Sequence, residues 1–188
     1  MTIGVLGLQG AVREHVHSLN RLGVDARIVK RSGDLDGLDG LVLPGGESTT
    51  ITRLAAGDVL SRLRRMAASG FPMFGTCAGM ILLAKSVEGN SVTTIGAIDI
   101  TVARNASGRQ VDSFETCLEV DTIGIDVSAV FIRAPYITRI GPDVCPMAVH
   151  EGVVVMARQK NVLVTSFHPE LTDDLRIHRY FAETMVTL

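Results

Sequence analysis

Short runs of apolar or β-branched residues alternate with amphipathic segments along the first half of the chain. Residues 3–6, 26–29, 41–43 and 73–74 predict strands, and the amphipathic segments 12–22 and 60–66 predict helices. Alternation of strands and helices is typical of a mainly parallel sheet with helices on both of its faces. The pattern therefore predicts an α/β fold of three layers.

The second half of the chain has a different pattern, with closely spaced strands and few helices. The expected strands are residues 97–102, 115–120, 130–132, 147–149, 153–157 and 162–166. We expect them to add antiparallel strands and hairpins to the same sheet. A last amphipathic helix is expected over residues 174–186, with Thr172 or Asp173 as its N-cap. No repeat or linker interrupts the pattern, so residues 1–188 are expected to form a single domain.

Length, charge and cysteine content narrow the kind of protein. A chain of 188 residues can bury roughly 70% of the surface that its unfolded form exposes. Its three cysteines are odd in number and far apart, so we expect a reducing cytoplasm, no disulfide framework, no metal and no cofactor. No apolar run approaches the roughly 20 residues of a membrane span. The net charge of -2, without a basic stripe, favours a small molecule or a protein as partner over a nucleic acid.

A cysteine lies at a predicted turn between a strand and a helix. The strand around Met73 leads into Gly75-Thr76-Cys77-Ala78-Gly79, and residues 80–85 are expected to be helical. Small residues on both sides of Cys77 allow the sharp bend of a nucleophile elbow, which lifts one side chain clear of the sheet. Amides at the start of the following helix favour the reactive thiolate. Cys77 is therefore the candidate nucleophile.

His168 and Glu170 form a second candidate feature, directly after the apolar strand at 162–166. Residues two apart in an extended segment point the same way, so Glu170 can orient the imidazole while the other ring nitrogen faces a cysteine. Without Cys77, a strand that ends in a polar turn would explain the motif better. Together with Cys77 it indicates a Cys-His-Glu triad.

A third feature is the glycine pair Gly45-Gly46, which follows the strand at 41–43. Paired glycines let backbone amides approach a ligand, as an oxyanion hole requires. The segment lacks the Gly-Lys-Ser/Thr of a P-loop. Alone, it is better explained as an ordinary strand-to-helix turn capped by Ser48 or Thr49.

Taken in their order along the chain, the three features resemble those of the class I glutamine amidotransferases. Longer stretches are similar, more narrowly, to the family of glutaminase subunits of pyridoxal 5'-phosphate synthase. Those stretches are residues 4–10, 13–15, 44–50, 75–84, 99–102, 104–105, 108–110, 112–115, 130–137 and 166–172. They cover nearly the whole chain, and the Gly-Gly-Glu-Ser-Thr-Thr and Phe-Ile-Arg-Ala-Pro motifs are far more specific than the elbow.

The resemblance implies hydrolysis of L-glutamine to L-glutamate and ammonia through a glutamyl thioester. It also implies a partner, a barrel synthase subunit that makes pyridoxal 5'-phosphate from a pentose phosphate and a triose phosphate. The implied triad is Cys77, His168 and Glu170, with an oxyanion hole made by the backbone amides of Gly46 and Ala78. The implied substrate contacts are Gly46, Glu47, Ser48, Arg104, Ile132 and Arg133. Two arginines suit the α-carboxylate of an amino acid.

Two alternatives remain open. The chain could serve another pathway, such as imidazole glycerol phosphate or anthranilate synthesis, whose glutaminases share the elbow and the His-Pro-Glu motif. It could also be a non-catalytic redox sensor on the same fold, with Cys77 as the sensing thiol. A sensor needs no dedicated general base, so the intact His168-Glu170 pair argues against it.

The remaining histidines and two departures from the family also yield expectations. Four histidines lack a context like that of the elbow and are expected to be surface or helix-face residues rather than ligands: His15, His17, His150 and His178. The chain has Ser107 where the family usually has an aromatic residue. It has Lys160 at a turn where glycine is common, and we expect Asn161 to take the positive φ angle there.

Overall fold

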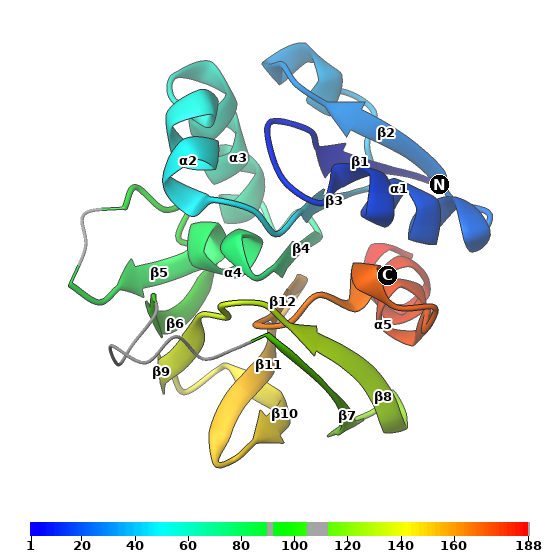
Figure 1. Ribbon diagram of the computed structural model, residues 1–188. Helices are drawn as coiled ribbons and strands as arrows, with labels where there is room; N and C mark the ends of the chain where they lie inside the picture. Colours follow the sequence, from blue (N-terminus) through cyan, green and yellow to red (C-terminus); the bar gives the residue numbers. More distant parts are fainter. Residues whose placement is uncertain (90–91, 105–112, 188) are drawn as a thin grey trace.

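The computed structural model describes residues 1–89, 92–104 and 113–187, and it has a seven-stranded sheet at its centre (Figure 1). The strands are β1 (Thr2–Leu6), β2 (Asp25–Val29), β3 (Gly40–Leu43), β4 (Met73–Thr76), β10 (Cys145–His150), β11 (Val153–Gln159) and β12 (Val162–Thr165). Their order is β10-β11-β12-β4-β3-β1-β2. The pairs from β12 to β2 are parallel, whereas β11 and β10 add antiparallel strands at one edge. This arrangement confirms the predicted α/β fold with a mainly parallel sheet.

Other elements cover both faces of this sheet, which gives the predicted three layers. One face carries α1 (Val12–Arg21), the C-terminal helix made of α5 (Arg176–Arg179) and the π-helical η3 (Tyr180–Val186), and the hairpin of β7 (Phe114–Val120) and β8 (Gly124–Phe131). The other face carries α2 (Ser48–Ala55), α3 (Asp58–Ala68), α4 (Ala78–Leu83) and a small sheet of β5 (Ala84–Val87), β6 (Ile98–Ala103) and β9 (Tyr136–Ile140). Two short 3-10 helices are η1 (Ser32–Leu35) and η2 (Pro169–Leu171).

The strands divide the hydrophobic core between the two faces. Met73 of β4 belongs to the core under α2, α3 and α4, whereas its neighbour Phe74 belongs to the core under α1 and α5. Val164 and Leu163 of β12 divide in the same way. Successive side chains of a strand point to opposite faces, and here both faces are covered. All residues of β3, β4 and β12 are therefore buried, as is typical of a parallel sheet between helices.

Only some strands of the second half of the chain join the central sheet. The prediction that all of them extend this sheet is therefore partly wrong. The β7-β8 hairpin and the β5-β6-β9 sheet are separate from it, and β10, β11 and β12 are the late strands that belong to it. The helix predicted at residues 80–85 ends at Leu83, because the next residues pair with β6 as strand β5. Alternation of apolar residues reveals a strand with a buried face, but it does not reveal which neighbour supplies the hydrogen bonds.

The last helix begins at Arg176 rather than at residue 174, and its N-cap is Leu175. Neither Thr172 nor Asp173 caps it, so this prediction is wrong. The side chains of Thr172 and Asp174 form hydrogen bonds within the turn that precedes the helix. The Asp174 carboxylate accepts from the Arg176 amide (3.0 Å), and the Thr172 hydroxyl accepts from the Asp174 amide (3.2 Å).

The turn between β11 and β12 also differs from its prediction. Lys160 itself has φ 52°, so the positive φ angle does not move to Asn161. Instead, the Asn161 side-chain amide donates to the carbonyl of Gly70 (2.9 Å), which ties the turn to the segment before β4. The other departure from the family, Ser107, lies outside the described residues.

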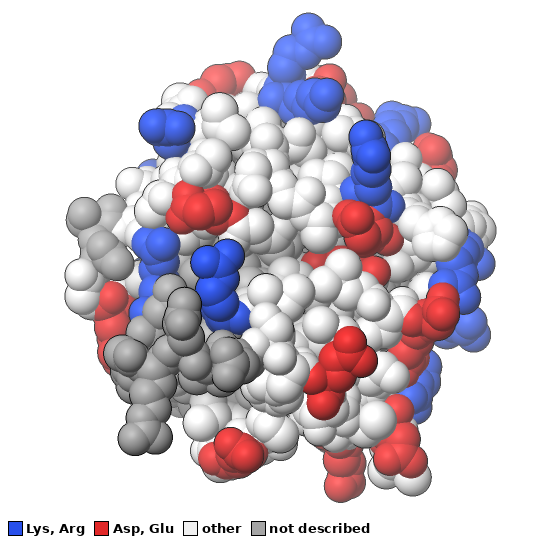
Figure 2. All heavy atoms as spheres, viewed as in Figure 1, with Lys and Arg blue, Asp and Glu red and all other residues white. Residues whose placement is uncertain are grey.

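The surface carries charges of both signs. On the face seen in Figure 2, lysine and arginine side chains are interspersed with acidic ones over a largely uncharged background. Among the helices within the three described ranges, none has the length and apolarity needed to cross a membrane.

We expect Gly79→Ala to destabilise the protein strongly. A Cβ at Gly79 would lie 1.9 Å from the carbonyl oxygen of Leu43, and backbone atoms of a central strand cannot turn aside. The free energy of unfolding, measured with urea, should fall by about 3 kcal/mol or more. Gly33→Ala is the matched control, because a Cβ there meets nothing within 4 Å. Equal stability of the two variants would contradict the close packing of α4 on β3.

Candidate active site

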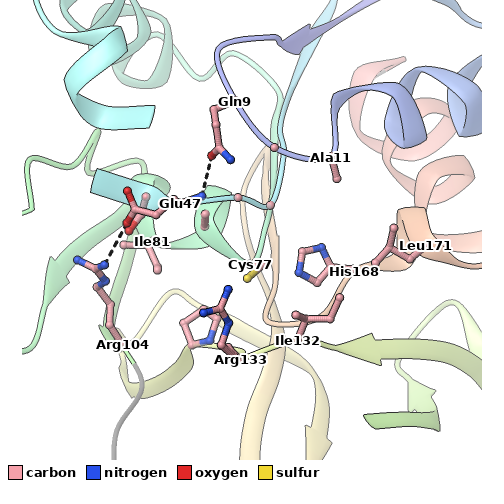
Figure 3. A pocket seen from close by; sticks show the side chains of 16 residues that line it. Gln9, Ala11, Glu47, Cys77, Ile81, Arg104, Ile132, Arg133, His168 and Leu171 are labelled. Carbon is pink, nitrogen blue, oxygen red and sulfur yellow. Dashed lines mark hydrogen bonds and ion pairs between the residues drawn. The ribbon is translucent and has the colours of Figure 1, made fainter. Parts of the chain in front are cut away.

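The carboxyl ends of four neighbouring parallel strands meet at one edge of the central sheet. Because β12, β4, β3 and β1 are adjacent, the loops that follow them share this edge, where ligands bind in open α/β sheets. A cavity of ≈ 430 Å³ lies there (Figure 3). Its lining residues are Gln9, Gly10, Ala11, Gly45, Gly46, Glu47, Ser48, Cys77, Ala78, Ile81, Arg104, Ile132, Arg133, Pro135, His168 and Leu171. The structure thus brings together every predicted site residue at the cavity, apart from Glu170, which lies behind it.

Cys77 stands at the turn between β4 and α4. Its backbone has φ 49° and ψ -104°, a conformation that a residue with a side chain rarely adopts and that fits a nucleophile elbow. The Cys77 amide donates to the carbonyl of Thr165 (2.8 Å), which ties the turn to β12. A Cβ at Gly75 would lie 2.6 Å from the backbone of Gly79, so glycine is needed for this close approach of strand and helix. In Figure 3 the sulfur faces the cavity, beside the ring of His168.

His168 is buried next to Cys77 and is held from two sides. Its amide donates to the carbonyl of Val130 in β8 (2.8 Å), and its Nδ1 lies 2.7 Å from Oε1 of Glu170. With Nδ1–H donated to the carboxylate, Nε2 is the nitrogen left for Cys77. Burial opposes the charged ring, but the hydrogen bonds with Cys77 and Glu170 outweigh burial and raise the pKa of His168 to about 10. The imidazolium form is therefore favoured at neutral pH.

Glu170 lies in the core behind His168, and three donors approach its Oε1. They are Nδ1 of His168 at 2.7 Å, the hydroxyl of Thr76 at 3.3 Å and Nε2 of His15 at 3.4 Å. Burial raises the pKa of this carboxyl, but His15 and His168 lower it by more, so the pKa lies well below its usual range. Glu170 is therefore an ionised side chain inside the protein, and the predicted pairing with His168 is present as a hydrogen bond.

The glycine loop after β3 packs directly against His168. A Cβ at Gly45 would lie 2.2 Å from Cε1 of the ring, so the loop backbone can approach only because this residue is glycine. The Gly45 amide donates to the hydroxyl of Thr76 (3.0 Å), and its carbonyl accepts from the amide of Ala11 (3.0 Å). Gly46 and Ala78, whose amides are predicted to form the oxyanion hole, both line the cavity. Their role stays a prediction.

Glu47 is the N-cap of α2, a role that the sequence analysis gave to the residues after it. Its carboxylate accepts from the amides of Thr49 (3.2 Å) and Thr50 (2.6 Å). Hydrogen bonds from these two threonines lower the pKa of Glu47 to about 2. The Glu47 amide donates to Oε1 of Gln9 (2.7 Å), and Arg104 Nη2 lies 3.4 Å from the carboxylate (Figure 3). The carboxylate is thus negatively charged and held in place at the rim of the cavity.

The turn after β8 brings Ile132 and Arg133 to the cavity. Arg133 has φ 43°, and Figure 3 shows its guanidinium group pointing into the cavity near Cys77. Arg104 reaches the cavity from the end of β6. A guanidinium group can make paired hydrogen bonds to a carboxylate, so the cavity is suited to a ligand that carries one.

Two histidines that we expected to be surface or helix-face residues lie on helices α1 and α5 and are fully buried beneath the site. His15 and His178 are both 0% exposed, and Nδ1 of His15 lies 2.9 Å from Nε2 of His178. Both rings pack nearly perpendicular to Phe74. Burial, and after it the effect of His15, lowers the pKa of His178 to about 3, so this ring is neutral. The expectation holds for His17, which is exposed, while His150 is half-buried in a stack with aromatic rings.

Helical spacing is the signal that could have revealed these buried histidines. His15 lies three residues after Val12 and four before Leu19, on the apolar stripe of α1. His178 lies three residues before Phe181 on the buried side of the last helix. A polar residue on a core-facing stripe needs a buried partner. This spacing, and no catalytic motif, places the two histidines on the buried faces of their helices.

The geometry suits attack on a carbonyl carbon. A thiol on a strand-to-helix turn lies beside a histidine whose far nitrogen is held by a carboxylate, so the histidine can protonate a leaving group. On a sheet of this topology, the arrangement is that of the class I glutamine amidotransferases. The model of the SNO glutamine amidotransferase family matches residues 5–187, and the chain belongs to that family.

Individual relatives agree with this assignment. The chain is 56% identical over 185 residues to a protein of Carboxydothermus hydrogenoformans named pyridoxal 5'-phosphate synthase subunit PdxT, with 97% of each chain covered. It is 46% identical to a solved structure of a glutamine amidotransferase, with 99% of each chain covered and a TM-score of 0.93. PurLQS from Thermotoga maritima aligns with a TM-score of 0.69 and 16% identity over 97% of each chain, which is a likeness of fold alone.

We expect the proton on His168 to make the protein less stable at alkaline pH. Its pKa of about 10 in the folded chain lies above its usual 6.5, so between these values the native state holds a proton that the unfolded state releases. This stabilisation is complete below pH 6.5 and is lost as the pH rises through 10. The difference in unfolding free energy between wild type and His168→Gln should shrink over that range. A constant difference over that range would contradict the protonated state.

Proposed function

We propose that the chain hydrolyses L-glutamine to L-glutamate and ammonia and delivers the ammonia to a pyridoxal 5'-phosphate synthase subunit. The observation that carries the proposal is the hydrogen-bonded His168-Glu170 pair next to Cys77, in a chain 56% identical to a relative named as a subunit of this synthase. The partner is a barrel enzyme that builds its product from a pentose phosphate and a triose phosphate. Residues 1–188 act as one glutaminase domain.

In the first half of the reaction, the Cys77 thiolate attacks the carboxamide carbon of glutamine. The imidazolium form of His168, favoured by its pKa of about 10, protonates the amide nitrogen as the C–N bond breaks and ammonia leaves. The backbone amides of Gly46 and Ala78 stabilise the oxyanion before it collapses. The product is a glutamyl thioester on Cys77 and a neutral His168.

In the second half, neutral His168 takes a proton from water as the water oxygen attacks the thioester carbon. The C–S bond breaks, glutamate leaves, and the thiolate and the imidazolium are restored. Glu170 keeps the imidazole in the tautomer whose Nε2 faces the sulfur in both halves. The two halves balance with glutamine and water as the only reactants.

The α-carboxylate and the α-ammonium group of glutamine hold the substrate in the cavity. Arg133 and Arg104 bind the α-carboxylate, since two guanidinium groups line a cavity of ≈ 430 Å³ that suits a small ligand. Gly46, Glu47, Ser48 and Ile132 supply the remaining contacts around the substrate. The ionised carboxylate of Glu47 at the rim complements a positively charged group, such as the α-ammonium of glutamine.

The alternatives have less support. The relatives at 56% identity are named as pyridoxal 5'-phosphate synthase subunits, not as glutaminases of imidazole glycerol phosphate or anthranilate synthesis. A redox sensor needs a reactive thiol but no histidine oriented by a buried carboxylate. His168 has such an orienting partner at 2.7 Å, which favours the enzyme.

We expect Cys77→Ala to abolish glutamate release while glutamine binding remains. Without the sulfur no thioester forms, so the rate should fall by about 10⁴-fold or more. Glutamate release is measured enzymatically, and binding is measured by calorimetry. Cys117→Ala and Cys145→Ala are matched controls, because both thiols are exposed in strands away from the cavity. A Cys77→Ala variant with normal turnover would rule out the nucleophile assignment.

We expect the conformation of the glycine loop to limit the rate at which the isolated chain releases glutamate. A peptide between two glycines can rotate at little cost, and the loop is held by contacts from Gln9 and Ala11 in the turn after β1. A partner that binds this turn can therefore change the conformation of the glycine loop. We expect weak glutamate release by the chain alone and a rate at least about 10-fold higher with the synthase subunit, since loop closure completes many active sites. Full activity of the chain alone would contradict this gating.

A further inference from the structure

Behind the cavity lies a chain of buried polar groups, and three of its members, His178, His15 and Thr76, have no part in the mechanism above. It runs from His178 through His15 and Thr76 to Glu170, and from Thr76 to the glycine loop. His15, Thr76 and His178 are 0% exposed, and Glu170 is 5% exposed. Burying polar side chains costs free energy, and apolar residues of similar volume are often more stabilising. Their position directly behind His168 suggests that these groups serve the site.

Side chains alternate between the two faces of strand β4, so Thr76 points towards this chain of buried polar groups. Phe74 faces the core under α1 and α5, and Thr76, two residues further on, faces the same side. There the ring of Phe74 packs against both His15 and His178. Cys77 follows Thr76 directly, so one strand end supplies both the candidate nucleophile and a group that reaches Glu170.

The directions of the hydrogen bonds follow from the ionised state of Glu170. A carboxylate only accepts, so Thr76 donates its hydroxyl proton to Oε1 (3.3 Å) and His15 presents a protonated Nε2 (3.4 Å). The oxygen of Thr76 then accepts from the Gly45 amide (3.0 Å) and from Nε2 of His15 (3.2 Å). One hydroxyl group therefore connects the carboxylate that orients His168 with the first amide of the glycine pair.

His178 supports the required tautomer of His15. In the tautomer of His15 that carries its proton on Nε2, Nδ1 is an acceptor, and Nε2 of His178 donates to it over 2.9 Å. Nδ1 of His178 has no hydrogen-bond partner among the described residues. An unprotonated nitrogen tolerates this better than a buried N–H would. The hydrogen bond from His178 to His15 thus leaves Nε2–H of His15 free to face Thr76 and Oε1 of Glu170.

We propose that Thr76 and His15 are positioning residues of this site. Together they hold Oε1 of Glu170 towards His168, and Thr76 also anchors the start of the Gly45-Gly46 loop to the same oxygen. The orientation of the general acid and the shape of the glycine loop are therefore coupled through one hydroxyl group. The inference rests on the proposed function for its effect on turnover, whereas its effect on the titration of His168 is independent of substrate and partner.

The test is the titration of His168, followed by NMR through the Cε1–H signals of labelled histidine in the chain alone. Thr76→Val removes the hydroxyl with little change of shape. We expect the pKa of His168 to fall by about one unit or more, because a carboxylate that turns away stabilises the imidazolium less. Thr76→Ser keeps the hydroxyl and should restore the wild-type titration. The other ionisable residues facing His168 or the cavity are unchanged in both variants: Cys77, Glu170, Glu47, Arg104 and Arg133.

His15 offers a second matched pair of variants. Gln places an amide donor close to the position of Nε2, whereas Leu fills the space without a donor. His15→Gln should titrate close to wild type, and His15→Leu should lower the pKa of His168. In a Glu170→Gln background, Thr76→Val should cause no further shift, because the charge through which it acts is gone.

Thr165→Val is the control for the loss of a buried hydroxyl. Thr165 pairs with Thr76 in the parallel register, is also 0% exposed, and donates to the carbonyl of Phe167 (2.9 Å) rather than to Glu170. The Thr165→Val variant should have a lower free energy of unfolding and an unchanged titration of His168. Hydrogen exchange of the Gly45 amide should become faster in Thr76→Val and stay unchanged in Thr165→Val.

The inference is wrong if His168 titrates in Thr76→Val as in wild type, or if Thr165→Val shifts it equally. Where His15→Leu does not fold, the Thr76 variants alone decide, since they preserve the volume. With the synthase subunit present, Thr76→Val should lower kcat by up to about 100-fold and change KM less. A wild-type chain that releases no glutamate with any synthase subunit would refute the proposed function, while the titration still decides the role of Thr76.

Discussion

One buried carboxylate must be kept ionised in this protein, and much of the site depends on how that is done. An unpaired charge in the core costs on the order of several kcal/mol. Three donors, from His168, Thr76 and His15, meet at Oε1 of Glu170 and offset that cost. They come from the loop after β12, from β4 and from α1. The helix must therefore pack on the sheet before the carboxylate can be accommodated, and the same contacts that stabilise the fold also orient the histidine.

The order of the strands decides which loops meet around this carboxylate. Because β12 and β3 flank β4, the loops that carry His168 and the glycine pair both reach Cys77 although they are far apart in the chain. The close approach needs backbone without side chains. A Cβ at Gly45 would enter the ring of His168, and one at Gly79 would enter the backbone of β3. Glycine is thus required here for space at the strand ends.

The charges of the site are arranged for chemistry on an amide that carries a carboxylate elsewhere. His168 holds a proton beside the thiol, and the arginines at the cavity balance the acidic Glu47 and attract an anionic group. Membership of the SNO glutamine amidotransferase family and the likeness to a solved glutamine amidotransferase, with a TM-score of 0.93, agree with this chemistry. The buried polar cluster behind the site reduces what an apolar core could contribute to stability, and it gives the carboxylate one defined orientation.

The sequence by itself determined the α/β class, most of the parallel strands and the elbow at Cys77, because hydrophobic period and turn motifs are local properties. Other predicted residues at the cavity, such as Arg104 and Arg133, followed only from the resemblance of longer stretches to a known family. Only the tertiary structure decided that the β7-β8 hairpin and the β5-β6-β9 sheet are separate from the central sheet, since a strand pattern does not name its partner. It also decided the place of His15, Thr76 and His178. The motifs that contain His15 and Thr76 assign no role to them, because their contacts with Glu170 and Gly45 exist only once α1 and the last helix pack against β4.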